Sequence, residues 1–191
     1  GVCAASAQAN PAQSYKTLTL PGILAGAGVA PLTYAQKDAL EQLGGSVVEP
    51  QTDGTVRIYD LVTTYTTNAL GAADDAWRYP ETIANVMAKI YSLDNLFTGT
   101  PFDRAIVVDD DAISGLDYAI SPKRVKGFVI KLIDDLWIPN AWSKNRDDIV
   151  ASVSAEINSG NAGRIDVELT DVIAAGLRIV AVKYNWTFQA A

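Results

Sequence analysis

Apolar and polar residues follow two different patterns along this chain of 191 residues. Residues 1–32 are mostly small or polar and are interrupted by prolines, which favours an extended lead-in or linker. From Thr33 onward, apolar residues recur at the spacing of helices or strands. We therefore expect residues 33–191 to form the folded domain, and we find no internal repeat.

Three segments of this domain have helical patterns. Thr33 can cap a helix over residues 34–43, and Gly44 follows where helices often end. Pro80 opens a second helix as its first residue. The apolar stripe of this helix consists of Ile83, Val86, Met87, Ile90 and Phe97. The clearest helix begins at Pro122. Its unbroken apolar stripe consists of Val125, Phe128, Val129, Leu132, Ile133 and Leu136.

The remaining patterns predict strands. An Asp-Gly pair at residues 53–54 is a strong signal for a hairpin over residues 47–62, because both residue types tolerate positive φ. A short strand is expected at residues 106–108, and alternation predicts strands at 149–157 and 165–169. Helices combined with such strands predict an α+β (mixed α/β) fold, with a mixed, mainly antiparallel sheet flanked by helices.

Composition and charge exclude several classes of protein. Lys and Arg total 15 against 22 Asp and Glu, and the formal net charge of −7 argues against nucleic-acid binding, which needs a basic face. With 0 His and 1 Cys, catalytic triads, His-ligated zinc and intrachain disulfides are excluded. The longest weakly polar run, residues 22–32, is too short to span a bilayer, so no membrane insertion is expected. Because Gly1 stands where an initiator would be, we expect a piece of a longer protein.

Few residues suggest chemistry. Asp109, Asp110 and Asp111 form the densest carboxylate cluster and could ligate Mg²⁺ or Ca²⁺, but they lack the spacing of an EF-hand, and a solvated loop is favoured. A Gly-rich stretch at residues 22–28 fits neither a dinucleotide fingerprint nor a P-loop. We therefore expect no catalytic residue, metal or cofactor. A carboxylate-based hydrolase stays open, and a pocket with two facing acids of perturbed pKa would indicate it.

Two features point to interfaces. Lys123, Arg124 and Lys126 crowd the first turns of the clearest helix, where the helix macrodipole disfavours cations, and Lys131 follows a little further on. They form either an ordinary solvated face or a patch for an acidic partner. Residues 177–188 are predicted to form a final strand, apolar on both faces for much of its length. Such a strand lies centrally in its own sheet, which the pattern alone favours, or is inserted into another chain's sheet.

Several sequence blocks resemble those of a known family. They are LTLPGI at residues 18–23, GTVRIYDLVTTY at 54–65, AADD at 72–75, ISPK at 120–123, RIDV at 164–167 and LRIVAV at 177–182. Together they make the chain similar to the C-terminal region of contractile tail sheath proteins, close to those of Mu-like myophages. The resemblance extends from about Cys3 to Phe188 and is most specific at residues 54–75.

The resemblance implies a structural protein of the virion tail rather than an enzyme. Sheath subunits polymerise around the tail tube in the host cytoplasm and contract to drive that tube through the host envelope. Their partners are neighbouring subunits, the tube protein, the baseplate and the tail terminator. The C-terminal region is the inner layer next to the tube. Tailocins and secretion sheaths are related machines that the sequence does not separate from a phage tail.

The resemblance also implies interface residues. Sheath subunits are joined by strand exchange, in which an N-terminal arm and a C-terminal strand add to the sheets of neighbouring subunits. By position, the exchange strand would lie at residues 177–188 and would include Leu177, Ile179, Val180, Val182, Tyr184, Trp186 and Phe188. Lys123, Arg124, Lys126 and Lys131 become a candidate tube contact, although no family motif assigns them that role. Without the N-terminal arm, we expect this piece alone to be a monomer or small oligomer.

Overall fold

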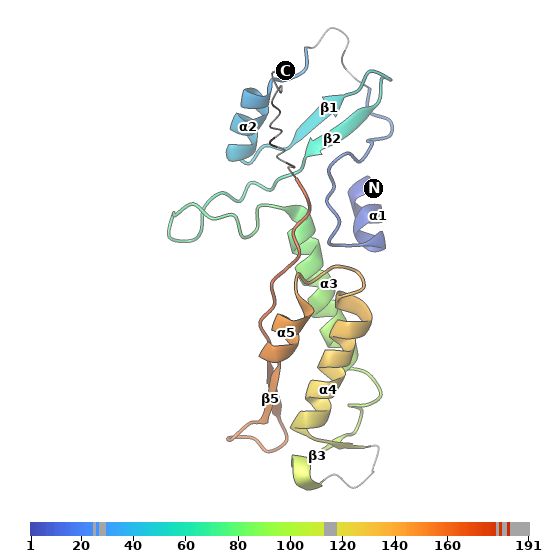
Figure 1. The fold of residues 1–191 in the computed structure, drawn as a ribbon, viewed down its shortest axis with the longest axis vertical. Coiled ribbons are helices and arrows are strands. Elements are labelled where there is room, and N and C mark those ends of the chain that lie inside the picture. Colours follow the sequence, from blue (N-terminus) through green and yellow to red (C-terminus); the bar gives the residue numbers. More distant parts are fainter. Residues whose placement is uncertain (25, 27–29, 113–117, 179, 181–182, 184–191) are drawn as a thin grey trace, which may run out of the picture.

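The computed structural model describes residues 1–24, 26, 30–112, 118–178, 180 and 183. The elements are α1 (Val2–Ala9), α2 (Tyr34–Gln42), β1 (Val47–Pro50), β2 (Val56–Asp60), α3 (Pro80–Phe97), β3 (Ile106–Val107), the 3₁₀ turn η1 (Asp110–Ala112), β4 (Ala119–Ile120), α4 (Pro122–Leu132), the π-helix η2 (Ile133–Trp137), α5 (Arg146–Ser152), β5 (Ser154–Ile157) and β6 (Ile165–Glu168). The molecule is elongated (Figure 1). One end holds α1, α2 and the β1–β2 hairpin, the other holds α4, α5 and β3–β6, and α3 runs between them.

The β1–β2 hairpin confirms the prediction made from its Asp-Gly turn. The two strands pair antiparallel, and Gly54 has a φ of +80°, which only a residue without a side chain adopts readily. Residues 17–20 pair with the other edge of β2: the amide of Thr17 donates to the carbonyl of Ile58 at 2.8 Å. β2 is therefore the central strand of this sheet. Within the described residues, β1 pairs with β2 alone and has no strand on its other edge.

The hydrophobic core lies at the opposite end, beneath α4. Its buried side chains are Val129, Ile133, Trp137, Trp142, Ile149 and Val153. Two small sheets flank it: β3 pairs parallel with β4, and β5 pairs antiparallel with β6. The fold is therefore a mixed α+β fold with small, mostly antiparallel sheets, as the sequence predicts. No helix in the described part of the chain is long and apolar enough to cross a membrane.

The acidic cluster before α4 has a local structural role. The side chain of Asp110 accepts a hydrogen bond of 2.8 Å from the amide of Lys123, in the first turn of α4. This bond, together with the hydroxyl of Ser121, lowers the pKa of Asp110 below its ordinary value. Ser121 also caps the helix, accepting from the amide of Arg124 at 3.4 Å. Among the described residues, no group of three potential ligand side chains is placed to hold a metal ion.

We predict that Ser121→Ala lowers the free energy of unfolding by about 1 kcal/mol, the usual cost of losing an N-cap. Ser121 is fully buried, so its loss also leaves a small void at the start of α4. Urea denaturation of the two chains measures the difference. Ser159→Ala, in an exposed turn, is the control and is expected to change stability by less than about 0.5 kcal/mol. Equal effects of the two substitutions would contradict the capping role.

Two segments differ from the predicted pattern. Residues 149–152, predicted as the beginning of a strand over 149–157, belong instead to α5. The side chain of Asn145 accepts from the amide of Asp147 at 3.0 Å and caps this helix. The predicted strand begins only at Ser154. Near the N-terminus, the alanine-rich residues 2–9 form α1, which the pattern did not predict and which the high helix propensity of alanine explains.

Candidate assembly interface

The predicted exchange strand lies mainly outside the described residues. Ile179, Val182, Tyr184, Trp186 and Phe188 belong to the part of the chain that the structure does not describe. The two other members of the set, Leu177 and Val180, are 73% and 70% exposed and lie in no described strand. The assignment of this segment to strand exchange therefore stays a prediction.

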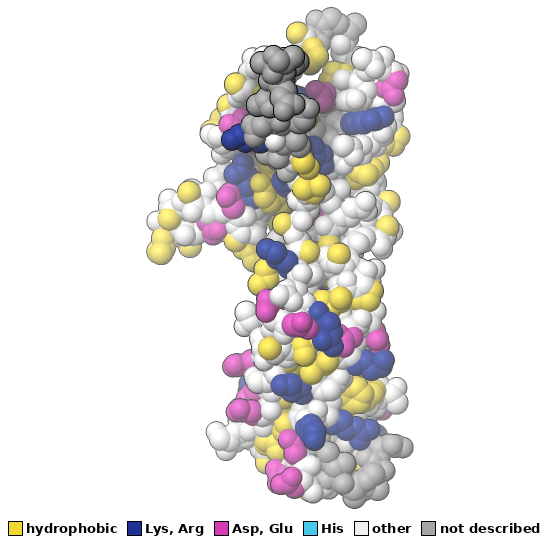
Figure 2. Space-filling view, viewed as in Figure 1, with side chains coloured by type: hydrophobic (Ala, Val, Ile, Leu, Met, Phe, Trp, Pro, Cys, Tyr) yellow, Lys and Arg dark blue, Asp and Glu magenta, His cyan; other side chains and the backbone are white. Residues whose placement is uncertain are grey.

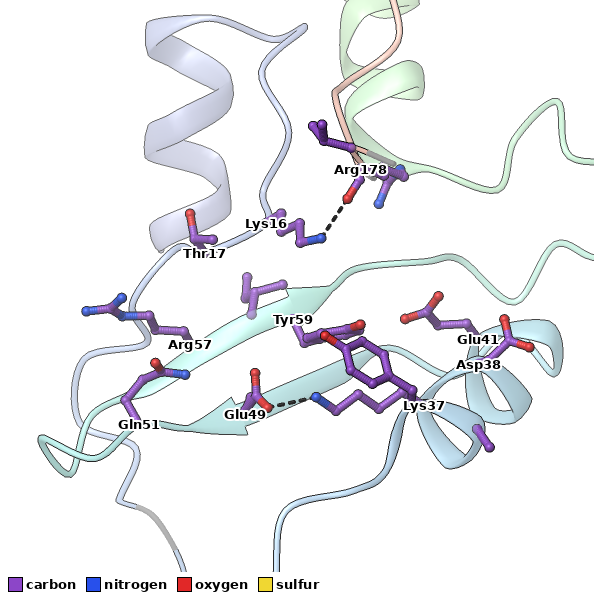
Figure 3. A pocket seen from close by; sticks show the side chains of 14 residues that line it. Lys16, Thr17, Lys37, Asp38, Glu41, Glu49, Gln51, Arg57, Tyr59 and Arg178 are labelled. Carbon is purple, nitrogen blue, oxygen red and sulfur yellow. Dashed lines mark hydrogen bonds and ion pairs between the residues drawn. The ribbon is translucent and has the colours of Figure 1, made fainter. Parts of the chain in front are cut away.

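The beginning of this segment is anchored by Arg178. Its guanidinium group forms ion pairs with Asp60, at the end of β2, and with Glu81, in the first turn of α3. It also lies over the ring of Tyr79, 3.5 Å from the ring centroid. The Nζ of Lys16 donates to the carbonyl of Arg178 at 2.7 Å (Figure 3). One residue thus joins the N-terminal segment, β2, α3 and the C-terminal segment.

The chain is closely packed just before this anchor, at Gly176. A Cβ atom placed on Gly176 would lie 2.8 Å from the Cβ of Ser14 and 3.4 Å from a carboxylate oxygen of Glu81. Because real Cβ atoms do not approach other heavy atoms this closely, only glycine fits at this position without local movement. The backbone at Gly176 is therefore closely packed against Ser14 and Glu81. The side chain of the next residue, Leu177, is 73% exposed.

A stripe of polar residues on α3 holds the neighbouring segments. Glu81, Asn85, Lys89 and Ser92 are all buried and follow one another at helical spacing. Lys89 forms an ion pair with Asp171. Its Nζ and the side-chain amide of Asn85 each donate to the carbonyl of Trp142 at 2.9 Å. The indole N–H of Trp137 donates to the hydroxyl of Ser92 at 2.9 Å. The most deeply buried side chains of α3 are thus polar and hydrogen-bonded. Beside them, Ala88, Leu93 and Leu96 pack against the hydrophobic core.

Burial shifts the pKa values of two charged residues in this stripe, Glu81 and Lys89. Burial raises the pKa of Glu81, and the nearby Arg178 opposes that shift. Burial lowers the pKa of Lys89, and Asp171 opposes that shift in turn. Both shifts arise because a low-dielectric environment disfavours the charged form. Each ionised group is stable in the interior only because its partner lies beside it.

Sequence reasoning identified α3 but not the role of this stripe. It recognised the apolar residues of α3, yet Met87 and Ile90 are 59% and 55% exposed in the structure. The polar residues repeat with the same helical period, so their spacing is a signal that could have identified the buried stripe. Arg178 stands within the apolar run LRIVAV, and no local pattern there signals its ion pairs.

A groove of about 810 Å³ lies between α2 and the face of the β1–β2 sheet (Figure 3). On its wall, the Nζ of Lys37 pairs with Glu49 at 2.7 Å and lies 3.9 Å from the centroid of the Tyr59 ring. Arg178 and Val180 line it as well. The groove therefore begins where the C-terminal segment leaves its anchor.

The four predicted basic residues lie on α4, but they are not equivalent. Lys131 pairs with Asp135 at 2.6 Å, and Arg124 donates to the carbonyl of Ala119 at 2.9 Å. Lys123 is exposed and Lys126 is half-buried. The lower part of the molecule in Figure 2 shows Lys and Arg side chains interspersed with Asp and Glu side chains and with hydrophobic patches. Lys123 and Lys126 are thus the members best placed to meet an acidic partner.

The structure also brings two acids together, as a hydrolase would require. Asp60 and Glu81 approach each other at the start of α3, but Arg178 lies between them and pairs with both. A carboxylate that is occupied by a guanidinium group is typical of a structural ion network rather than of an acid–base pair. The arrangement therefore gives the hydrolase alternative no specific support.

Comparison with known proteins finds a likeness of fold. No protein-family model matches the chain, and no curated protein matches it. The fold is similar to that of a chain in the cryo-EM structure of the anti-feeding prophage (AFP) baseplate, 6-fold symmetrised, with a TM-score of 0.61 and 16% sequence identity. The match covers 93% of this chain but only 46% of the other, so the present chain corresponds to less than half of that protein. At this identity the likeness establishes the fold.

Proposed function

We propose that this chain is part of a structural subunit of a contractile injection system, of the tail-sheath type. The observation that carries the proposal is the similarity of fold, over 93% of the chain, to a chain of the anti-feeding prophage baseplate. It agrees with the sequence blocks that resemble sheath proteins of Mu-like myophages. In this role the subunit polymerises around a tail tube, and the assembled sheath contracts to drive that tube through a host envelope.

The geometry of the hairpin sheet supports a connection by strand exchange. The chain is fixed at Arg178, which is paired with buried carboxylates, and continues from there toward residues 179–191. The edge of β1 has no strand partner among the described residues. We propose that residues 179–188 of one copy add to the open β1 edge of a neighbouring copy. Main-chain hydrogen bonds then join the copies.

The basic face of α4 is the proposed contact with the tube. Lys123 and Lys126 would lie opposite acidic side chains of the tube protein, and such complementarity guides association and fixes the orientation of the partners. Because the fold-similar chain comes from a baseplate assembly, a position at the baseplate end of the tail is a second candidate. Immunogold labelling distinguishes the two, since a sheath subunit is labelled along the whole tail and a baseplate subunit at one end.

The proposal is tested by co-expressing the protein, as its gene encodes it, with its tube protein. We expect negative-stain images of tubes covered by a regular sheath. Lys123→Glu is expected to weaken co-sedimentation with the tube by about tenfold. Lys144→Glu, an exposed reversal outside the basic cluster, is the matched control and should not change co-sedimentation. Bare tubes in the presence of folded wild-type protein would overturn the proposed function, and equal effects of the two reversals would overturn the tube contact.

A further inference from the structure

The groove between α2 and the β1–β2 sheet extends along the whole of α2 (Figure 3). One face of the helix lines it, formed by Tyr34, Lys37, Asp38 and Glu41. Burial raises the pKa of Glu41, and the nearby Arg178 is one of the cations that oppose this shift. Arg178 therefore lies at the Glu41 end of the groove, and Tyr34 marks the other end.

The chain that follows the anchor enters this groove. Arg178 and Val180 both line it, whereas the side chain of Leu177 is 73% exposed and does not. Successive side chains of an extended chain point to opposite sides. An extended continuation would therefore turn Val182 and Tyr184 to the same side as Val180, toward the groove.

The length of the groove matches a short extended segment. The nine residues of α2 make a helix about 13.5 Å long, and residues 180–184 span about 13 Å when extended. Because this segment is tethered at Arg178, its effective concentration at the groove is about millimolar, far above that of a second copy in dilute solution. The chain's own segment is therefore the favoured occupant.

The wall of the groove also suits an uncharged occupant. Lys37 is paired with Glu49 at 2.7 Å and lies 3.9 Å from the centroid of the Tyr59 ring. Valine and tyrosine side chains pack on such a surface without leaving that cation unpaired. Residues 179–191 contain one charged side chain, Lys183, which is exposed and has the parity that points away from the groove.

We propose that in the unassembled chain residues 180–184 lie in the groove of their own chain, facing it with Val180, Val182 and Tyr184. The segment must leave this groove before it can add to the β1 edge of a neighbouring copy, so the docked state restrains assembly. The restraint rests on the proposed function. The docking does not, and it is tested on the isolated chain.

Maleimide labelling of single cysteines tests the docking. The cysteines are introduced one at a time in a Cys3→Ser background, and labelling is measured in dilute solution where the chain is monomeric. Val182→Cys and Tyr184→Cys are expected to react about tenfold more slowly than Ala181→Cys and Lys183→Cys, because only the first two face the groove. Equal rates at the four positions would overturn the docking.

A substitution that fills the groove locates the contact. Ala35 lies on the α2 wall and is exposed, so Ala35→Trp should block the groove and raise the labelling rate of Val182→Cys to that of Ala181→Cys. Ala39 is equally exposed on α2 but does not line the groove, and Ala39→Trp is the matched control. Protection that survives Ala35→Trp, in a chain that circular dichroism shows to be folded, would overturn the assignment to this groove.

The restraint on assembly is measured with the tube protein present. Ala35→Trp is expected to assemble on tubes severalfold faster than the wild type, and Ala39→Trp at the wild-type rate. An Ala35→Trp chain that has lost its protection but assembles no faster would overturn the restraint. Protected cysteines in a chain that never forms a sheath would support the docking and overturn the proposed function alone.

Discussion

Arg178→Met is expected to lower the free energy of unfolding by about 3–5 kcal/mol, the cost of removing one partner from a buried ion pair. The side chains of Asp60 and Glu81 are 11% and 3% exposed, and without the guanidinium group they are left close together with no cation. The loss also separates the C-terminal segment from β2 and α3. Urea denaturation, followed by far-ultraviolet circular dichroism, measures the effect.

Two further variants separate this cause from a general effect of losing an arginine. Arg164 forms an ion pair with Asp166, but its side chain is 63% exposed, so Arg164→Met should cost less than about 1 kcal/mol. Adding Glu81→Gln to Arg178→Met removes one of the unpaired charges and should recover part of the loss. If the double variant were less stable than Arg178→Met alone, the ion network would not be the origin of the effect.

Lys89→Met is expected to have a comparable effect, again about 3–5 kcal/mol. It leaves the carboxylate of Asp171, which is 12% exposed, without its cation. It also removes the Nζ group that donates hydrogen bonds to the hydroxyl of Ser143 and to the carbonyl of Trp142. Asp171→Asn combined with Lys89→Met removes the unpaired charge and should restore stability in part. Thermal and urea denaturation of the single and double variants measure the difference.

The pH dependence of stability gives an independent check on Lys89. Burial lowers its pKa below the ordinary value of 10.5, so between the folded pKa and 10.5 the unfolded chain binds more protons than the native chain. The free energy of unfolding of the wild type therefore rises with pH through that window and falls as pH decreases through the folded pKa. Lys89→Met should lack this component. Parallel pH profiles of the two proteins would contradict the assignment.

Local signals in the sequence were sufficient for several elements. The Asp-Gly turn predicted the β1–β2 hairpin, and the apolar period predicted α4, because the interactions that decide them lie within a few residues. The overall α+β class followed from the combination of such elements. The helix α5 was missed because its capping residue, Asn145, precedes a segment whose apolar residues also alternate.

Long-range bonds decided what the sequence pattern could not. Arg178 lies 118 residues from Asp60 and 97 residues from Glu81 in the chain, so no local spacing reveals the anchor. The orientation of α3 is likewise decided by residues far away in the chain. Both of its stripes have a helical period, and the one that is buried bonds to the carbonyl of Trp142 and the carboxylate of Asp171. A pattern identifies an amphipathic helix, whereas its partners determine which face is buried.

The central claim, that the segment after Arg178 joins one copy to the β1 edge of the next, is tested most directly by cross-linking. In a Cys3→Ser background, a tagged chain with Val182→Cys is assembled on tubes together with an untagged chain carrying Val48→Cys, a β1 position that is 49% exposed. The account predicts that a short bismaleimide joins tagged to untagged chains. A product that forms only when both cysteines are on one copy, with no mixed product, would contradict it.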